Sequence, residues 1–462
     1  MHRRTQMRFA GACATLWLVG CGEKITAPSD NTTSAPEIQA ATAEVSALAA
    51  EVRQLAADRG LVPLARPAPV RRELSVLGQA LAFDKILSGN RDISCMTCHL
   101  TGIATSDARS VAIGQGGSGL GPNRVHPQNV FVHRSAPPLF NLQATNTLTW
   151  DGRVFRSPLG AIRTPEKLTT AQKSVLEFGA LSALPMFPPL SRPEMRATSG
   201  NELAAIPDTK PQTVWNALML RLGAIPQYRT MFQAAYPGVP FDSMSFAHAG
   251  NAIGGWITAV FSTTDTPWDN MLRGNDDAMT LQQLQGAKLF MTTGRCSRCH
   301  NGAMLSDGKF HNVAVPQVGP GFGNGPTGQD DFGRMRQTQN TADKYKFRTA
   351  PLRNVELTAP YGHDGAIVSL RAWVDHYSRS DLKLQSYDPS QLEPLLQGTL
   401  QPTTADILLT RDTRLTTLVL KPSQVDAITE FLKALTDPAA RDLSRFVPLT
   451  VPSGLPIDNF VR

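Results

Sequence analysis

Two short stretches of the sequence carry side chains that could do chemistry together. SCMTCH occupies residues 94–99 and RCSRCH occupies residues 295–300, and both contain the pattern Cys-x-x-Cys-His. Two thiols one helical turn apart, followed at once by a histidine, have the spacing of a c-type haem attachment site. The thiols can reach the two vinyl groups of one haem, and the histidine then lies beneath the iron as its proximal ligand. The sequence therefore predicts two covalently bound haem c groups, one held by Cys95, Cys98 and His99 and one by Cys296, Cys299 and His300.

Zinc binding and thiol redox chemistry are the alternatives for these cysteines. A zinc ion would need both pairs at one site, and a redox-active Cys-x-x-Cys pair does not explain why a histidine follows twice. The chain has six cysteines, and the other two lie near its start, at Cys13 and Cys21. No cysteine is left over for a disulfide.

An internal repeat supports two related haem domains. Arg134-Ser-Ala-Pro and then Trp150-Asp-Gly follow the first site, and Arg348-Thr-Ala-Pro and then His363-Asp-Gly follow the second. The order of the motifs is the same in both halves, and their spacing is nearly so. The chain is therefore expected to hold two haem domains in tandem.

The elements that must position these motifs are predicted to be mainly helices. Apolar residues recur at helical spacing over 37–58, 73–84, 245–262, 280–290 and 422–436, and strand-like alternation is rare. The prolines of 61–70 indicate a linker. We expect a mainly α fold of two tandem cytochrome c-like haem domains with long loops. The chain is divided into 1–21 (signal), 22–70 (tether and amphipathic helix), 71–270 (N-terminal haem domain) and 271–450 (C-terminal haem domain).

The first 21 residues have the features of an export signal. Arg3, Arg4 and Arg8 precede a short apolar stretch, which ends in Leu-Val-Gly-Cys at residues 18–21. This ending resembles a bacterial lipobox, in which Cys21 receives a lipid and becomes the new N-terminus. The alternative is an ordinary signal with a chance cysteine. Gly22 gives no retention signal for the inner membrane, so we expect a periplasmic protein held on the outer membrane through a lipid on Cys21.

Charge and motifs exclude two other classes of partner. The formal net charge is +7 and falls to +4 when the three arginines of the signal are removed. The basic residues do not cluster, so no nucleic-acid footprint is seen. The glycine-rich run at 114–121 lacks the Lys-Ser/Thr ending of a phosphate-binding loop.

Several motifs together resemble the bacterial di-haem cytochrome c peroxidases and their relative MauG. They are the two Cys-x-x-Cys-His sites, WDGR at 150–153, PEM at 193–195 and LRNVELTAPYGHDG at 352–365. The resemblance covers roughly residues 73–440, although the segment 154–185 is longer than in the family. It implies that His99 is the proximal ligand of the haem that reacts with peroxide and His300 that of a relay haem.

The resemblance also implies roles for residues around the two haems. Glu194 matches a distal carboxylate that takes a proton from H2O2 and returns it to the leaving oxygen. Pro188 matches a distal-pocket proline that fills space without offering a ligand, and Trp150 matches an indole that relays electrons between the haems. Thr358 and Pro360 match two carbonyl ligands of a calcium ion, but Ser135 stands where the family has a third ligand, an asparagine.

Two positions differ from the typical peroxidase of this family. A histidine that blocks the reactive haem in that enzyme is replaced by Gln115, a poor iron ligand, so the reactive haem is expected to be open. A methionine that caps the relay iron is replaced by Tyr377, as in MauG. A phenolate favours Fe(III) and higher states, so both irons could reach Fe(IV). Tyr361 and His376 lie close by in the sequence and compete with Tyr377 for this assignment.

The expected function is a MauG-like di-haem c-type oxidoreductase that uses hydrogen peroxide. It would form high-valent haem iron and oxidise a substrate or a protein partner by long-range electron transfer. Two alternatives remain at this point. One is a cytochrome c peroxidase that removes H2O2 with a small redox protein as donor, and the other is a di-haem electron carrier without catalysis.

Overall fold

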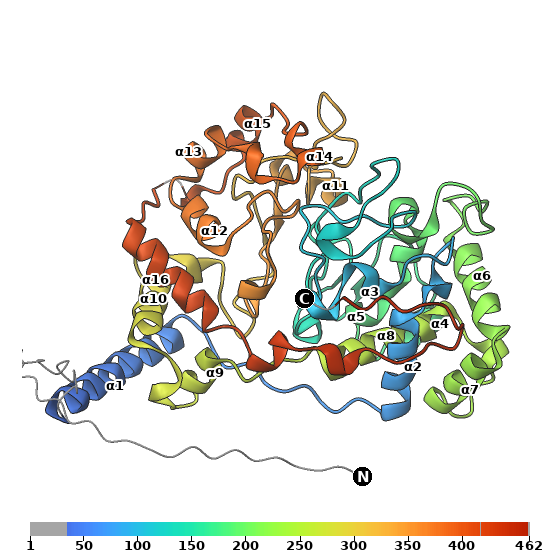
Figure 1. The fold of residues 1–462 in the computed structure, drawn as a ribbon, viewed down its shortest axis with the longest axis horizontal. Coiled ribbons are helices and arrows are strands. Elements are labelled where there is room, and N and C mark those ends of the chain that lie inside the picture. Colours follow the sequence, from blue (N-terminus) through green and yellow to red (C-terminus); the bar gives the residue numbers. More distant parts are fainter. Residues whose placement is uncertain (1–34, 416, 461–462) are drawn as a thin grey trace, which may run out of the picture. The chain divides into compact units, whose positions relative to one another are not determined.

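The computed structural model describes residues 35–415 and 417–460 (Figure 1). The predicted signal, the lipid site at Cys21 and the first part of the predicted tether lie outside the described residues. The residues from Glu44 onward form one compact unit. Within the described part, no helix has the length and the apolar character that crossing a bilayer requires.

The described residues are mainly helical, with two very small sheets. The sheets are antiparallel pairs, β1 (Phe155–Arg156) with β2 (Ile162–Arg163), and β3 (Phe310–His311) with β4 (Phe347–Arg348). The prediction of a mainly α fold is confirmed. The helices are α1 (Ala35–Asp58), α2 (Arg72–Phe83), α3 (Cys95–Cys98), α4 (Thr170–Ser174), α5 (Ala180–Ala183), α6 (Pro211–Gly223), α7 (Pro226–Ala235), α8 (Phe246–Val260), α9 (Pro267–Leu272), α10 (Leu281–Met291), α11 (Met335–Thr338), α12 (Leu370–Tyr377), α13 (Ser380–Gln385), α14 (Pro394–Gln397), α15 (Thr404–Leu409) and α16 (Pro422–Lys433).

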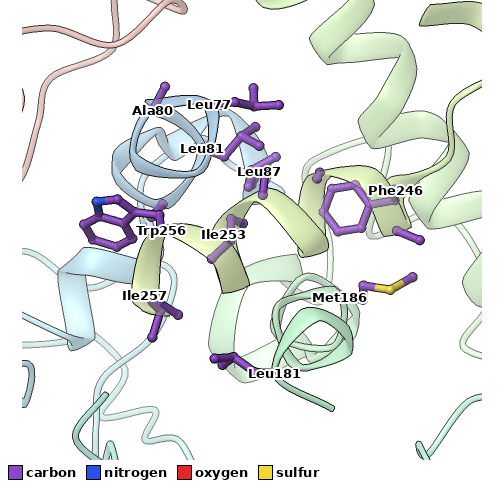
Figure 2. Packing of buried hydrophobic residues seen from close by; sticks show 14 of the residues in the cluster. Leu77, Ala80, Leu81, Leu87, Leu181, Met186, Phe246, Ile253, Trp256 and Ile257 are labelled. Atoms are coloured by element: carbon purple, nitrogen blue, oxygen red, sulfur yellow. The ribbon is translucent and has the colours of Figure 1, made fainter. Parts of the chain in front are cut away.

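The first hydrophobic core is built around the crossing of α2 and α8. Figure 2 shows Leu77 and Leu81 of α2 facing Ile253 of α8, with Leu181 and Met186 on the other side of α8. The two helices approach very closely at Gly78, where an added Cβ would lie 2.0 Å from the carbonyl oxygen of Ala252. Only glycine allows this approach, which places the helix that precedes the first haem motif directly on the core.

The second core repeats this arrangement with α10 and α16 (Figure 1). A Cβ on Gly286 of α10 would lie 1.9 Å from the carbonyl oxygen of Ala427 on α16. In each half, therefore, the helix that leads to the Cys-x-x-Cys-His motif crosses a later helix at a glycine. Side chains of α1, including Val52 and Ala56, also belong to this second core.

The chain returns to the first half after α16. Leu443 and Val451 are part of the first core, and Lys85 forms an ion pair of 2.6 Å with Asp458. The Ser453 hydroxyl donates to Asp84 at 2.6 Å. The packing therefore differs from the predicted range 271–450 of the second domain, because the residues after Asp437 cover apolar surface of the first one.

An ion-pair cluster joins the two halves. The guanidinium of Arg134 donates two hydrogen bonds to Asp331, at 2.6 and 3.0 Å, and pairs with Asp151 at 2.9 Å. Arg134 and Asp151 belong to the first half and Asp331 to the second, and all three side chains are buried. Burial alone would raise the pKa of Asp331, but Arg134 outweighs it and lowers that pKa to about 2.

Candidate functional site: two haem c sites and the link between them

The two predicted proximal histidines have matching surroundings. The Nδ1 of His99 lies 3.1 Å from the carbonyl oxygen of Thr105, and the Nδ1 of His300 lies 2.9 Å from that of Leu305. A carbonyl only accepts hydrogen bonds, so each Nδ1 carries the proton and each Nε2 keeps the lone pair that binds a metal. Burial lowers the pKa of both rings, which favours this neutral form. Both sites therefore fit the proximal side of a haem iron.

A largely apolar cavity, called the second cavity below, adjoins the second Cys-x-x-Cys-His motif. Its wall comes from both halves of the repeat and from α10, α12 and α16. Cys296 and Cys299 carry free thiols, as thioether formation requires. Among the lining residues are Trp150, Ser135, Cys296, Cys299, His300, Arg348, Thr358, Pro360, His363 and Tyr377. The donor set and the apolar wall fit a covalently bound haem.

Tyr377 lines this cavity, and its phenol hydroxyl has no hydrogen-bond partner among the described residues. It ends α12 and packs edge to face on Trp373 at 5.5 Å between ring centroids. Burial raises the pKa of its hydroxyl, and the nearby thiols of Cys296 and Cys299 raise it further. Among the described residues, none forms a hydrogen bond with the Tyr377 hydroxyl. The phenol is thus free to bind a group placed over His300.

Neither competitor of Tyr377 presents a free ligand atom to this cavity. The hydroxyl of Tyr361 donates to the carbonyl oxygen of Val355 at 2.9 Å. His376 is absent from the lining of the cavity, since its Nε2 lies 2.8 Å from the carbonyl oxygen of Val313 and its ring stacks on Trp373. The geometry therefore favours Tyr377 among the three residues near this position.

Arg348 gives an independent sign that the cavity is built for an anionic group. Its side chain is buried and lines the cavity, its Nε has no hydrogen-bond partner, and no carboxylate pairs with it within the described part of the chain. Burial without a counter-charge lowers the pKa of its guanidinium to about 10. Haem carries two propionate carboxylates, so the unpaired guanidinium fits the predicted cofactor. The equivalent arginine of the first repeat, Arg134, has two carboxylate partners instead.

The structure brings the distal candidates of the first site together. Glu194 lies in a π-helical turn, Arg192–Arg196, and its carbonyl oxygen accepts a hydrogen bond of 2.9 Å from the backbone N–H of Gln115. A Cβ on the neighbouring Gly114 would lie 1.9 Å from the carbonyl oxygen of Pro193. The charge of Glu194 is also felt at the first motif. Burial raises the pKa of the Cys98 thiol most, and Asp107 and then Glu194 raise it further.

The side chain of Gln115 is held at the edge of this site. Its Oε1 accepts a hydrogen bond of 2.8 Å from Asn90, and Asn90 in turn accepts one from Asn201 at 2.8 Å. Pro188 opens a short helical turn, Pro188–Leu190, that follows Met186. The indole of Trp215 fixes that segment by donating to the carbonyl oxygen of Met186 at 2.8 Å. Neither Gln115 nor Pro188 offers a strong iron ligand, and the open reactive haem stays a prediction.

Trp150 connects the two repeats through the backbone. Its indole Nε1 donates to the carbonyl oxygen of Ser135 at 3.2 Å, and its own carbonyl oxygen accepts from the N–H of Arg348 at 2.9 Å. The N–H of Ser135 donates to the carbonyl oxygen of His363, also at 2.9 Å. The indole lines the second cavity. This position, between the halves and beside one haem site, is the one a relay needs.

The two predicted calcium ligands lie next to these residues. Thr358 and Pro360 both line the second cavity, as Ser135 does, and the hydroxyl of Thr358 donates to the carbonyl oxygen of Val355 at 3.2 Å. Among the described residues, the grouping of three ligand-type side chains is Cys299, Asp307 and His311, of which Cys299 and His311 line the same cavity. Because Cys299 is needed for the haem thioether, this grouping is not interpreted as a separate metal site.

Sequence reasoning missed two arginines of these sites. The guanidinium of Arg124 donates to the carbonyl oxygens of Ile113 at 2.7 Å, Gly114 at 2.6 Å and Gly119 at 2.9 Å, and so shapes the loop that carries Gln115. Arg348 was visible only as the first letter of a repeated motif. Its sequence signal, an arginine that recurs in both halves, did not reveal that one copy lacks a counter-charge.

The fold and the sites define a helical protein of two cytochrome c-like halves, each with one haem c site. A family model described as "Di-haem cytochrome c peroxidase" matches residues 72–277. The cytochrome c551 peroxidase of Pseudomonas aeruginosa is 32% identical over 310 residues, which cover 66% of this chain and 72% of that protein. The chain belongs to the di-haem cytochrome c peroxidase family and is a peroxidase-type oxidoreductase. Membership in this family implies two haem c cofactors.

MauG and a MauG-like protein are also similar to this chain. The methylamine utilization protein MauG of Methylorubrum extorquens is 25% identical over 331 residues, covering 70% of this chain and 74% of that protein. The crystal structure of a MauG-like protein associated with microbial copper homeostasis aligns with a TM-score of 0.57 at 23% identity, covering 84% of this chain and 97% of that one. The structural likeness concerns the fold.

Proposed function

We propose that this protein is a MauG-like member of its family, which reacts with hydrogen peroxide in the fully oxidised state and oxidises a protein partner at a distance. The observation that carries the proposal is the free phenol of Tyr377 in the cavity of His300, where its competitors Tyr361 and His376 are engaged elsewhere. An anionic oxygen ligand stabilises oxidised iron, whereas methionine sulfur favours the reduced form. A relay site of this kind is suited to giving electrons up rather than to waiting in the reduced state.

The residues around the first site would transfer the protons of H2O2 and keep the haem iron accessible to it. Bound haem supplies the iron at which peroxide is reduced and the oxidising equivalents are held. Glu194 accepts a proton from the near oxygen of H2O2 and delivers it to the far one, so that water leaves. Gln115 and Pro188 keep the peroxide side free of a competing ligand. His99 would hold the haem iron through the Nε2 that its bond to Thr105 leaves available.

Trp150 would carry the electrons between the sites. Its indole nitrogen is bonded to Ser135, and its backbone is bonded to Arg348 of the second half. These two bonds hold the ring in one place beside the second cavity. A fixed indole at this position can pass an electron without a large rearrangement.

The second candidate function is peroxide removal with a small redox protein as donor. It is favoured by the 32% identity to a protein named a cytochrome c551 peroxidase. The two candidates differ in whether the oxidised protein reacts with peroxide directly. A donor-dependent peroxidase of the typical kind needs one electron first, and the proposed MauG-like enzyme does not.

Calcium binding is proposed at the carbonyl oxygens of Thr358 and Pro360, with Ser135 as the third position. Backbone carbonyls and water are ligands that calcium accepts. Metal analysis of the purified protein should find one calcium per chain, and a chelator should alter the optical spectrum of the haems. A calcium-free protein with an unchanged spectrum would refute the site.

The location of the protein is also a proposal. The signal-like N-terminus and the Leu-Val-Gly-Cys sequence support an enzyme that faces the periplasm and is held on the membrane by a lipid at Cys21. Covalent haem attachment takes place after export, which agrees with this location. Mass spectrometry of the mature N-terminus should find a diacylglycerol on Cys21, and an unmodified or differently cleaved N-terminus would contradict it.

Stopped-flow mixing with peroxide separates the two candidate functions. The fully ferric protein and a protein reduced by one electron are each mixed with one equivalent of H2O2. The proposal predicts a fast optical change in the ferric protein and no faster reaction in the half-reduced one. A ferric protein that stays unchanged, together with a half-reduced protein that reacts, would establish the donor-dependent peroxidase instead.

A further inference from the structure

A short β-hairpin follows Trp150 directly and has no role in the sites described above. It consists of β1 (Phe155–Arg156) and β2 (Ile162–Arg163), joined by the turn Ser157–Ala161. The turn closes with a hydrogen bond of 2.8 Å from the N–H of Ser157 to the carbonyl oxygen of Ala161. Only a few residues separate the start of the hairpin from the proposed relay residue.

The base of the hairpin is fixed to both halves of the protein. The N–H of Arg156 donates to the carbonyl oxygen of Asn146 at 2.8 Å. The guanidinium of Arg334, from the second half, donates to the carbonyl oxygens of Asp151 at 3.1 Å and Gly152 at 3.2 Å. The same guanidinium lies over the ring of Phe155, 5.8 Å from its centroid. A contact at the tip is therefore held at a defined position relative to Trp150.

The tip of the hairpin is an exposed apolar residue between two exposed cations. Leu159 is 97% exposed, and Pro158 and Ala161 beside it are exposed as well. Arg156 is opposite Ile162 in the ladder and Arg163 is opposite Phe155, so the two arginines project from opposite faces. Both are exposed, and neither forms an ion pair with any described residue.

The surrounding sequence strengthens the positive charge. Residues 153–173 contain Arg153, Arg156, Arg163, Lys167 and Lys173 but only one acid, Glu166. The side chains of Lys167 and Lys173 also lack an ion-pair partner among the described residues. An apolar contact with a cationic rim has the make-up of a protein interface.

We propose that this hairpin is the docking site for a small acidic redox protein, which delivers electrons to the haems through Trp150. The inference deepens the proposed function and rests on it: it names a small redox protein as the partner that is oxidised, and it differs from the second candidate function because the ferric enzyme reacts with peroxide before the partner supplies an electron. The unpaired cations would attract an acidic surface and steer its approach, and Leu159 would insert into an apolar patch beside the partner's redox centre. One leucine buries too little apolar surface to anchor the hairpin in a lipid bilayer, so a protein is the partner that the observations favour.

The proposed reaction uses two electrons for each H2O2, and two reduced partner molecules supply them by docking one after the other. Each reduced partner loses one electron and leaves oxidised by one unit. Two such electrons and two protons convert one H2O2 into two molecules of water, as the O–O bond breaks and two O–H bonds form. The oxidant is the peroxide that the family's activity already uses.

The test compares two electron donors of opposite charge with the full haem-loaded protein. The donors are a reduced acidic plastocyanin and a reduced basic cytochrome c, each oxidised in the presence of H2O2 at low and at high salt. Arg156→Glu with Arg163→Glu reverses the charge of the hairpin, and Leu159→Asp removes its apolar tip. The matched control is Arg59→Glu with Lys210→Glu, which changes the net charge equally at two exposed residues elsewhere.

The proposal predicts a specific loss for the acidic donor. At low salt, kcat/KM should fall by about 10- to 100-fold in the hairpin double variant and about 5-fold in Leu159→Asp. The double variant's loss should vanish at high salt, whereas the control and the basic donor should be little affected. An equal loss in the control, an unchanged rate with the acidic donor, or a preference of the wild-type protein for the basic donor would overturn the proposal.

Two further measurements separate this inference from the proposed function. Oxidation of hydroquinone, a small uncharged donor, should be the same in all variants. If the ferric protein fails to react with peroxide, the proposed function fails, but docking can still be measured by titrating the ferric protein with redox-inert, zinc-substituted plastocyanin. Binding that is lost only in the hairpin variants supports the docking site. Binding that survives in them, or hairpin-dependent binding to anionic lipid vesicles alone, refutes it.

Discussion

The carbonyl oxygen of Trp150 accepts a hydrogen bond of 2.9 Å from the backbone N–H of Arg348. One residue belongs to the WDGR motif of the first half and the other to the repeated Arg-x-Ala-Pro motif of the second. The indole of Trp150 and the guanidinium of Arg348 both reach the same cavity. A single backbone hydrogen bond thus holds Trp150, the proposed relay residue, next to Arg348, the residue proposed to bind a haem propionate.

Replacement of Arg348 by glutamine should change the second haem more than it changes the fold. Loss of the cation beside the propionates should lower the reduction potential of that haem, by about 60 mV if the charge changes the equilibrium tenfold. Spectroelectrochemical titration measures this directly. Arg336→Gln, at a cation that lies over Phe322 instead, is the control. Equal potentials in Arg348→Gln and the wild type would show that Arg348 does not sense the haem charge.

The buried pair of Arg134 and Asp331 should make the contact between the halves sensitive to acid. The folded pKa of Asp331 is about 2, below its ordinary value of 3.8. A lowered pKa contributes stability above pH 3.8 that is lost as the pH falls through about 2, and the shift corresponds to about 2 kcal/mol. The thermal unfolding temperature of the wild type should therefore fall more steeply below about pH 4 than that of Asp331→Asn.

At neutral pH, Asp331→Asn should itself be destabilised by about 2–4 kcal/mol, because Arg134 loses its bidentate partner in a buried place. Asp277→Asn changes an exposed carboxylate and should be neutral. Parallel acid profiles of Asp331→Asn and the wild type in calorimetry would contradict the assigned role of this ion pair.

The glycines at the two helix crossings should not tolerate even alanine. Alanine normally stabilises a helix relative to glycine by about 1 kcal/mol. Gly78→Ala and Gly286→Ala should instead destabilise the protein by about 1–3 kcal/mol, because their Cβ atoms would meet the backbone of α8 and α16. Gly398→Ala, with open space around it, should be neutral. Denaturant unfolding of the three variants gives the comparison, and a stabilised Gly78→Ala would mean that the crossing is looser than described.

The sequence was sufficient for the parts of the protein that local chemistry determines. The Cys-x-x-Cys-His motifs located both sites, and the apolar spacing located α2, α8, α10 and α16 with their ends displaced by only a few residues. The glycines within α2 and α10 gave no local signal of their role. Their meaning appears only when a second helix, far along the chain, is placed against them.

Other features depend on contacts that no local pattern contains. Arg134 and Arg348 start the same repeated motif, yet one finds Asp331, 197 residues further along, and the other finds no acid within the described residues. Leu443 and Val451 likewise pack on the first core because they cover apolar surface of that core, and no sequence motif marks this contact. The preference for Tyr377 over Tyr361 and His376 as the proposed ligand rests on hydrogen bonds and cavity lining that no sequence pattern contains.

Replacement of Glu194 should slow the reaction with peroxide without closing the site. Glu194→Gln keeps the shape and the backbone bond to Gln115 but cannot take up a proton. The rate constant with H2O2 should fall by about 100- to 10,000-fold, while the binding rate of nitric oxide, a ligand that binds without losing a proton, should change little. Stopped-flow spectroscopy measures both. Equal losses for the two ligands would indicate a blocked site rather than a missing base.

The most direct test of the central claim is an EPR titration of the ferric protein with one equivalent of H2O2, carried out on the wild type and on Tyr377→Met. The account predicts that both ferric signals of the wild type disappear with no reductant added and that a long-lived near-infrared absorbance develops. In Tyr377→Met the second haem should keep its ferric signal and the near-infrared absorbance should be absent. A wild-type protein whose ferric signals persist until one electron is added, or a Tyr377→Met variant that behaves like the wild type, would contradict the role assigned to Tyr377.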